Sequence, residues 1–92
     1  MITALVFIRT DVDVVNDVAE AVAALEGVSE VYSVTGDLDL VAIIRVRSLD
    51  EVSTVVTDGV ARVPGILATE THVAFRTYSR HDLETAFSIG LD

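Results

Sequence analysis

Apolar and polar positions follow two different periods along this chain, and their order predicts the fold. A period of two is typical of strands, and apolar positions three and four apart are typical of helices. The strand pattern covers residues 2–10, 28–35, 39–47 and 66–78, and helical patterns follow the first and third of these runs. The order β-α-β-β-α-β, with right-handed crossovers, predicts an α+β, ferredoxin-like fold: a four-stranded antiparallel sheet with two helices on one face.

The two helical segments carry recognisable start and stop signals. Asp11 or Asp13 is expected to cap the first helix, and Gly27 is expected to end it in a left-handed conformation. Ser48 and Glu51 have the spacing of a capping box, and Pro64 ends the second helix. The predicted buried stripes are Val15, Val18, Val22 and Leu25 in the first helix, and Leu49, Val52, Val56 and Val60 in the second.

The strands at residues 2–10 and 39–47 are apolar on both faces, which predicts that both faces are covered. Leu40, Ala42, Ile44 and Val46 share one face of the latter, and Val41 and Ile43 lie opposite. Because two helices cover only one side of the sheet, a second copy is expected to cover the other. The prediction is a homodimer that forms an α/β sandwich, or barrel, with its sheets face to face.

The amino-acid composition narrows the range of possible functions. The 92 residues are 51% hydrophobic and carry a net charge of -9, which argues against direct contact with nucleic acid or an anionic membrane. There is no cysteine, so disulfides and thiolate sites are excluded. Charges interrupt every apolar run before the roughly 18 residues of a membrane span, and no basic leader precedes the first strand. A cytoplasmic location is the resulting expectation.

Candidate chemistry is sparse, and each candidate has a structural alternative. Asp37 and Asp39 could form a carboxylate pair, or they could serve the turn around Gly36. Thr69 and Thr71 share a strand face and could bind a small polar ligand or simply suit a strand. A metal cluster of His81, Asp82 and Glu84 is less favoured than an exposed polar tail. No catalytic residue, metal site or cofactor is predicted.

Two motifs resemble those of one family. Residues 34–40 read Val-Thr-Gly-Asp-Leu-Asp-Leu, and a Val-Pro-Gly-Ile sequence at 63–66 precedes Thr69-Glu70-Thr71. Together they resemble the Lrp/AsnC ligand-binding domain, also called the RAM domain, over roughly residues 2–78, nearly the whole chain. The domain is taken as residues 1–78. Residues 79–92 form a tail with no assigned role, in which Leu83, Phe87 and Leu91 favour a short helix.

The resemblance implies a non-catalytic domain whose face-to-face dimers assemble further, often into octamers. Amino-acid effectors would bind in clefts between dimers, lined by Gly36, Asp37, Leu38, Asp39, Thr69 and Thr71. Position 38 is commonly aromatic in the family and is Leu here.

The family's transcription factors carry an N-terminal helix-turn-helix, whereas this chain begins at the first strand. The expectation is a stand-alone metabolite sensor or accessory domain that works with a full-length regulator. Two alternatives remain: a structural interaction module, and a small enzyme on the same dimeric fold.

Overall fold

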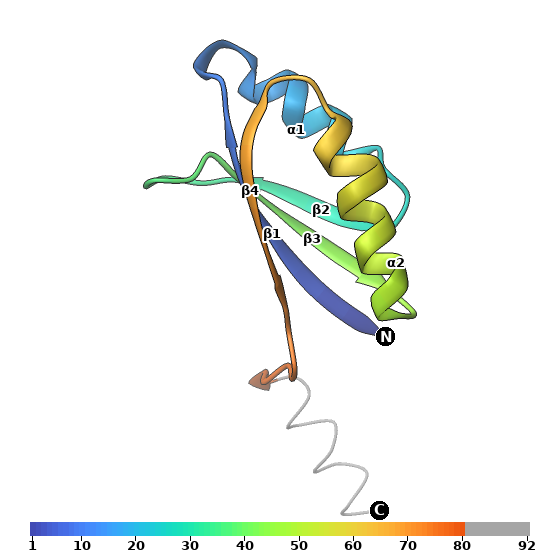
Figure 1. Ribbon diagram of the computed structural model, residues 1–92. Coiled ribbons are helices and arrows are strands. Elements are labelled where there is room, and N and C mark those ends of the chain that lie inside the picture. The colour runs from blue at the N-terminus through green and yellow to red at the C-terminus, as the bar shows by residue number, and fades with distance from the viewer. Residues whose placement is uncertain (81–92) are drawn as a thin grey trace, which may run out of the picture.

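The computed structural model describes residues 1–80 and has the predicted topology (Figure 1). Its strands are β1 (Ile2–Thr10), β2 (Val28–Ser33), β3 (Leu40–Val46) and β4 (Ile66–Val73). They form one antiparallel sheet in the order β2-β3-β1-β4. The helices α1 (Val15–Ala23) and α2 (Leu49–Thr54) lie on one side of that sheet, which confirms the ferredoxin-like fold.

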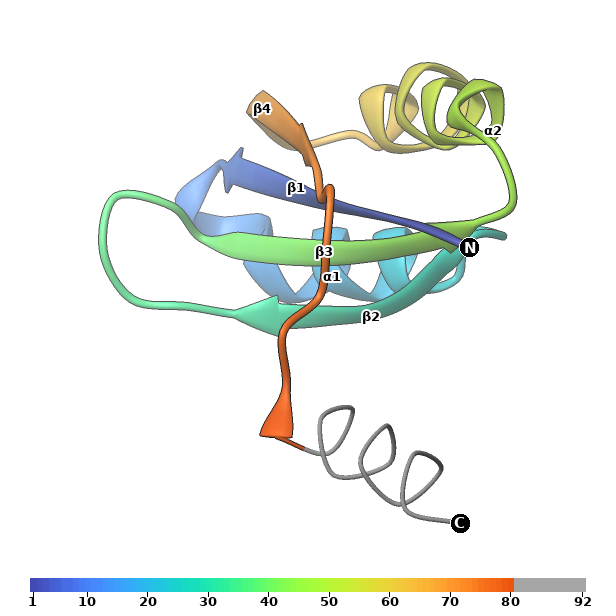
Figure 2. The same ribbon diagram turned by 90° about the horizontal axis from the view of Figure 1, so that it is seen from below.

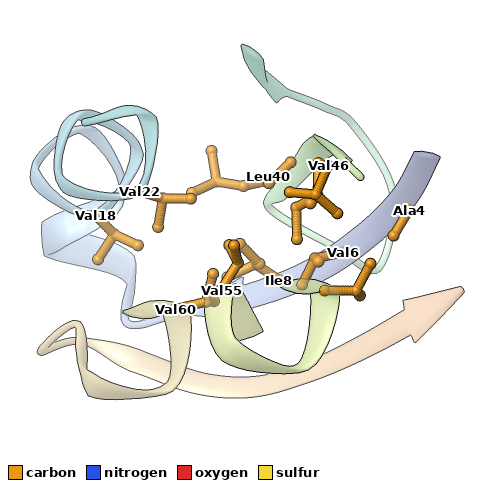
Figure 3. Packing of buried hydrophobic residues seen from close by; sticks show 12 residues of the cluster. Ala4, Val6, Ile8, Val18, Val22, Leu40, Val46, Val55 and Val60 are labelled. Carbon is orange, nitrogen blue, oxygen red and sulfur yellow. The ribbon is translucent and has the colours of Figure 1, made fainter. Parts of the chain in front are cut away.

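The core lies between the sheet and the two helices (Figure 3). Alternate residues of the central strands point into it, and Val6 of β1 lies directly opposite Ala42 of β3. The fully buried strand residues are Ala4, Val6, Ile8, Leu40, Ala42 and Ile44. Val18 and Val22 of α1 pack against them, as the first helical stripe predicts. The core is therefore built almost entirely from aliphatic side chains.

The start of α1 differs from the prediction. A short 3-10 turn, η1 (Val12–Val14), precedes the helix, and neither Asp11 nor Asp13 caps it through a side chain. Backbone bonds hold the turn instead: the Asp11 N–H donates to the Gly65 carbonyl over 2.9 Å, and the Val14 N–H donates to the Asp11 carbonyl. The predicted side-chain cap was therefore wrong, although Gly27 does adopt the expected left-handed conformation, with φ of 93°.

The capping box of α2 is confirmed in its first half. The Glu51 N–H donates to the Ser48 hydroxyl over 3.2 Å. The Glu51 carboxylate, however, accepts from the backbone N–H of Arg47 over 2.9 Å, one residue before the expected partner. Both bonds satisfy backbone amides where the chain enters the helix.

The buried face of the second helical segment also differs from the prediction. Val52, Val55 and Val60 are buried, whereas Leu49 is 59% exposed. The cause is a π-helical turn, η2 (Val55–Gly59), followed by a 3-10 turn, η3 (Val60–Arg62). Hydrogen bonds in a π turn join residues five apart, so Val55 and Val60 both meet the sheet. The predicted stripe assumed a regular helix.

The last strand is shorter than predicted. It ends at Val73, although the Ala74 N–H still donates to the Thr3 carbonyl over 2.9 Å. All of its residues after Ile66 are exposed, because β4 is an edge strand and α2 does not cover it closely. The β1–β4 register shifts between Arg9 and Thr10, so Leu67 departs from the simple alternation predicted for it. β2 likewise ends at Ser33 instead of residue 35.

The predicted short helix in the tail, and the His81, Asp82 and Glu84 cluster, lie outside the described residues.

Gly65 is held against the start of α1 and should tolerate no side chain. Its φ is 95°, and an added Cβ would lie 2.6 Å from a Val14 methyl. We expect Gly65→Ala to lower the free energy of unfolding by about 2–4 kcal/mol, through backbone strain and overpacking. Gly36→Ala is the control, because Gly36 also has a positive φ but no atom within 4 Å of its added Cβ. Urea unfolding at equal protein concentration should separate them, and equal midpoints would contradict the packing argument.

Candidate functional site

The turn that joins β2 to β3 projects beyond the end of β1 (Figure 2). It closes through the Val34 N–H, which donates to the Asp39 carbonyl over 3.0 Å. Gly36 has a φ of 107°, a conformation that favours glycine, and its surroundings are open. We call residues 34–39 the hairpin turn.

The hairpin turn is fastened to the end of β1 by three hydrogen bonds. The Asp39 N–H donates to the Ile8 carbonyl over 3.0 Å, and the Asp39 carboxylate accepts from the Thr10 N–H over 2.8 Å. Arg9 Nε donates to the Asp37 carbonyl over 3.2 Å. Thr10 is buried and lies where the β1–β4 register shifts, so its N–H needs this partner. Asp39 therefore does more than form a local turn, because it anchors the turn to a distant strand.

The outer part of the hairpin turn is available to a ligand. Gly36 and Asp37 are exposed, and Leu38 is partly buried. Within residues 1–80 the Asp37 carboxylate has no hydrogen bond or ion pair. The anchored backbone thus presents an unpaired carboxylate beside an open glycine.

Thr69 and Thr71 lie on the helix-covered side of β4. Thr69 is opposite Ile8, and Thr71 is opposite Val6, both of which point into the core. Thr71 also lines a small groove of about 260 Å³ between β4 and α2, with Leu49, Val52, Ser53, Val56 and Thr57. No hairpin residue lines that groove.

The candidate residues are therefore only partly brought together. Leu40, which follows the hairpin turn, pairs with Ile8, and Ile8 pairs with Thr69. The base of the turn and Thr69 thus lie in one row across the sheet, about 10 Å apart at two strand spacings. Thr71 lies two residue pairs further from the turn. One copy of the described chain does not enclose a pocket around all six residues.

The sheet face opposite the helices is apolar at its centre. Phe7 lies between Val41 and Glu70, and Leu5 lies between Ile43 and His72. Phe7, Leu5, Val41 and Ile43 are all partly exposed, and we call this surface the open face. The ring of His72 meets Phe7 edge-on with centroids 5.2 Å apart, and its Nε2 lies 3.3 Å from the Glu70 carboxylate.

The Lrp/AsnC ligand binding domain matches residues 3–83 of this sequence. The chain belongs to this family. Domains of the Lrp/AsnC family are non-catalytic, so the alternative of a small enzyme was wrong. The family link also ties the chain to transcription regulators, and its domains typically oligomerise and bind effectors.

Two proteins similar to this Lrp/AsnC domain are a solved structure and a curated regulator. The protein TTHA0845 of Thermus thermophilus is 49% identical, with a TM-score of 0.82 over 87% of this chain and 100% of that one. The HTH-type regulator PH1916 of Pyrococcus horikoshii is 36% identical over 82% of this chain and 52% of its own length. The chain thus spans about half of the curated relatives that it matches.

The fold extends to more distant regulators. The regulator NMB0573 of Neisseria meningitidis, solved in complex with L-Met, has a TM-score of 0.76 at 16% identity. The match covers 86% of this chain and 53% of that one.

A larger groove in this Lrp/AsnC domain was missed by the sequence reasoning. It measures about 600 Å³ and lies where β3 ends. It is lined by Met1, Glu26, Gly27, Arg45, Val46, Arg47, Glu51, Thr54 and Val55, and we call it the β3-end groove. Arg45 forms an ion pair with Glu30 at 2.9 Å, and this contact lowers the pKa of the partly exposed Glu30 carboxyl. A hydrogen bond between the side chains of Tyr32 and Glu30 raises the pKa of Tyr32.

Within residues 1–80, no three His, Asp or Glu side chains group as a metal site would require. No helix in the same residues has the length and apolar character of a membrane crossing.

Proposed function

We propose that this Lrp/AsnC domain senses a small molecule, most simply an amino acid, at the outer face of the hairpin turn. The observation that carries the proposal is the fastening of the turn to β1, which holds Gly36 and Asp37 outward and leaves the Asp37 carboxylate without a partner among residues 1–80. Preorganisation of this kind lowers the cost of binding a small ligand.

The turn offers both halves of an amino-acid site. Exposed backbone amides around Gly36 suit an α-carboxylate, and the Asp37 carboxylate suits an α-ammonium. Asp39 keeps one carboxylate oxygen that is not used by Thr10. Leu38 would meet the effector's side chain, while Thr69 and Thr71 would supply hydroxyls from β4. The L-Met complex of NMB0573 supports the proposal, since that protein shares the fold.

Assembly would complete the site. A second copy would cover the open face, because Leu5, Phe7, Val41 and Ile43 form an apolar centre that the helices do not reach. Further association of these dimers, up to an octamer, would bring the turn of one dimer against β4 of another. This accounts for the incomplete enclosure in one chain.

The proposed setting is cytoplasmic regulation of transcription. The net charge of -9 opposes direct contact with DNA, so we propose that the domain acts through a DNA-binding regulator of the same family. Mixed assembly through the open face would provide the link. Effector binding would bias assembly only by its different affinity for the two states.

Native mass spectrometry with and without the twenty amino acids tests the proposal. A dimer-based oligomer that gains ligand mass is the expected result. An assembly that is indifferent to every amino acid would contradict sensing and favour a purely structural interaction module.

For any amino acid found this way, Asp37→Asn should raise the dissociation constant about tenfold or more, through loss of a charged partner of the ammonium. Asp58→Asn is the matched control, because Asp58 is exposed on η2 and its substitution removes the same charge elsewhere. Isothermal titration calorimetry measures both. Equal affinities of the two variants for the amino acid would show that Asp37 is not part of the binding site.

A further inference from the structure

The β3-end groove lies at the opposite end of the sheet from the hairpin turn. The turn directly precedes Leu40, whereas Arg45, Val46 and Arg47 line the groove where β3 ends. Five strand residues, 40–44, lie between Asp39 of the turn and Arg45 of the groove, a span of about 20 Å. A ligand in this groove would therefore contact none of the residues proposed for the effector.

The floor of the groove is apolar and closely packed. It is formed by Gly27, Val46 and Val55, which pack so closely that a Cβ on Gly27 would lie 2.7 Å from a Val55 methyl. Two backbone amides fix its edge: the Arg45 N–H donates to the Gly27 carbonyl over 3.0 Å, and the Arg47 N–H donates to the Glu51 carboxylate. The groove is therefore preformed, and 600 Å³ is within the range of small-molecule sites.

The positive charge of Arg47 on the rim is uncommitted. Arg45 is paired with Glu30, but the Arg47 guanidinium has no carboxylate within 4.0 Å among residues 1–80. Glu26 and Glu51 also line the groove, and the whole chain has a net charge of -9. This arrangement suits a ligand with a single negative charge, because the two carboxylates would repel a multiply charged anion.

We propose that the β3-end groove is a second binding site, for a small aliphatic monocarboxylate. The carboxylate would pair with the Arg47 guanidinium, whose planar fork matches carboxylate geometry. The aliphatic chain would lie on Val46 and Val55. No group at the hairpin turn takes part.

The test is an NMR titration of the full chain with 4-methylpentanoate, followed through backbone amide shifts. Gly27 and Thr54 line the groove and should shift with saturation. The amine with the same six-carbon skeleton, 4-methylpentan-1-amine, should leave them unmoved, and so should inorganic phosphate. Unmoved amides with the carboxylate, or equal shifts with the amine or with phosphate, would overturn the proposal.

Arg47→Gln should raise the dissociation constant for 4-methylpentanoate about tenfold or more, which corresponds to loss of one charge-assisted pair. Arg62→Gln is the matched control, because Arg62 is exposed on η3 and does not line the groove. Both variants should keep the native amide spectrum elsewhere, since neither side chain is buried. If both variants weakened binding equally, the effect would come from the overall charge of the protein, and the proposed site would be wrong.

Discussion

Phe7→Asp should convert the assembly into monomers at micromolar concentration. Phe7 lies near the middle of the open face, between Val41 and Glu70. In a symmetric dimer through this face, two unpaired carboxylates would be buried. At about 3 kcal/mol for each buried charge, the dimer would weaken by about 6 kcal/mol, or roughly 10⁴-fold in its dissociation constant.

Sedimentation velocity measures this change, and circular dichroism checks that the fold is retained. The fold should survive, because Phe7 is outside the buried core of the single chain. Val12→Asp is the matched control, since Val12 is 89% exposed and lies away from the open face. If Phe7→Asp sediments like the control, the open face is not the contact between copies.

Asp39→Ala should loosen the attachment of the hairpin turn to β1 and weaken effector binding. The Asp39 carboxylate is the acceptor for the Thr10 N–H over 2.8 Å, and Thr10 is only 4% exposed. Removal leaves a buried donor without a partner, which costs about 1–3 kcal/mol of unfolding free energy. The turn also loses one of the three hydrogen bonds that present Gly36 and Asp37 to a ligand.

Urea unfolding and amide hydrogen exchange at Thr10 would measure the loss. Asp39→Asn should be intermediate, because its amide oxygen can still accept the bond without the charge. Asp37→Ala serves as the control and should change stability by less than about 0.5 kcal/mol, since its side chain is exposed and has no partner within residues 1–80. Unchanged exchange at Thr10 in Asp39→Ala would contradict the anchoring role.

The period of two was sufficient to predict which strand residues are buried, because the alternation of apolar and polar residues is a local property of the sequence. Leu40, Ala42, Ile44 and Val46 were expected on one face, and all four are buried. Periodicity did not predict the buried face of the second helical segment correctly, since the π turn at Val55–Gly59 rotates that face. Val55 in that turn packs closely against Gly27, the residue before β2, and no local pattern predicts such a contact.

In the candidate site, too, local features were predicted from the sequence and contacts between distant residues were not. The motif around Gly36 located the hairpin turn, but turn chemistry alone did not predict that Asp39 would bond to Thr10, 29 residues away. The β3-end groove was missed because its lining comes from separated segments of the chain. Only the fold places Glu26 and Arg47 on the same rim.

The fastening of the hairpin turn also has an evolutionary consequence. The atoms that hold it are backbone groups, the Arg9 guanidinium and the Asp39 carboxylate. Thr35 and Asp37 are exposed and contribute no side-chain bond to the fastening. Recognition and foldability are thus encoded by different residues within one short turn. A lineage, or a designer, can diversify positions 35 and 37 toward new effectors while the scaffold that displays them stays intact.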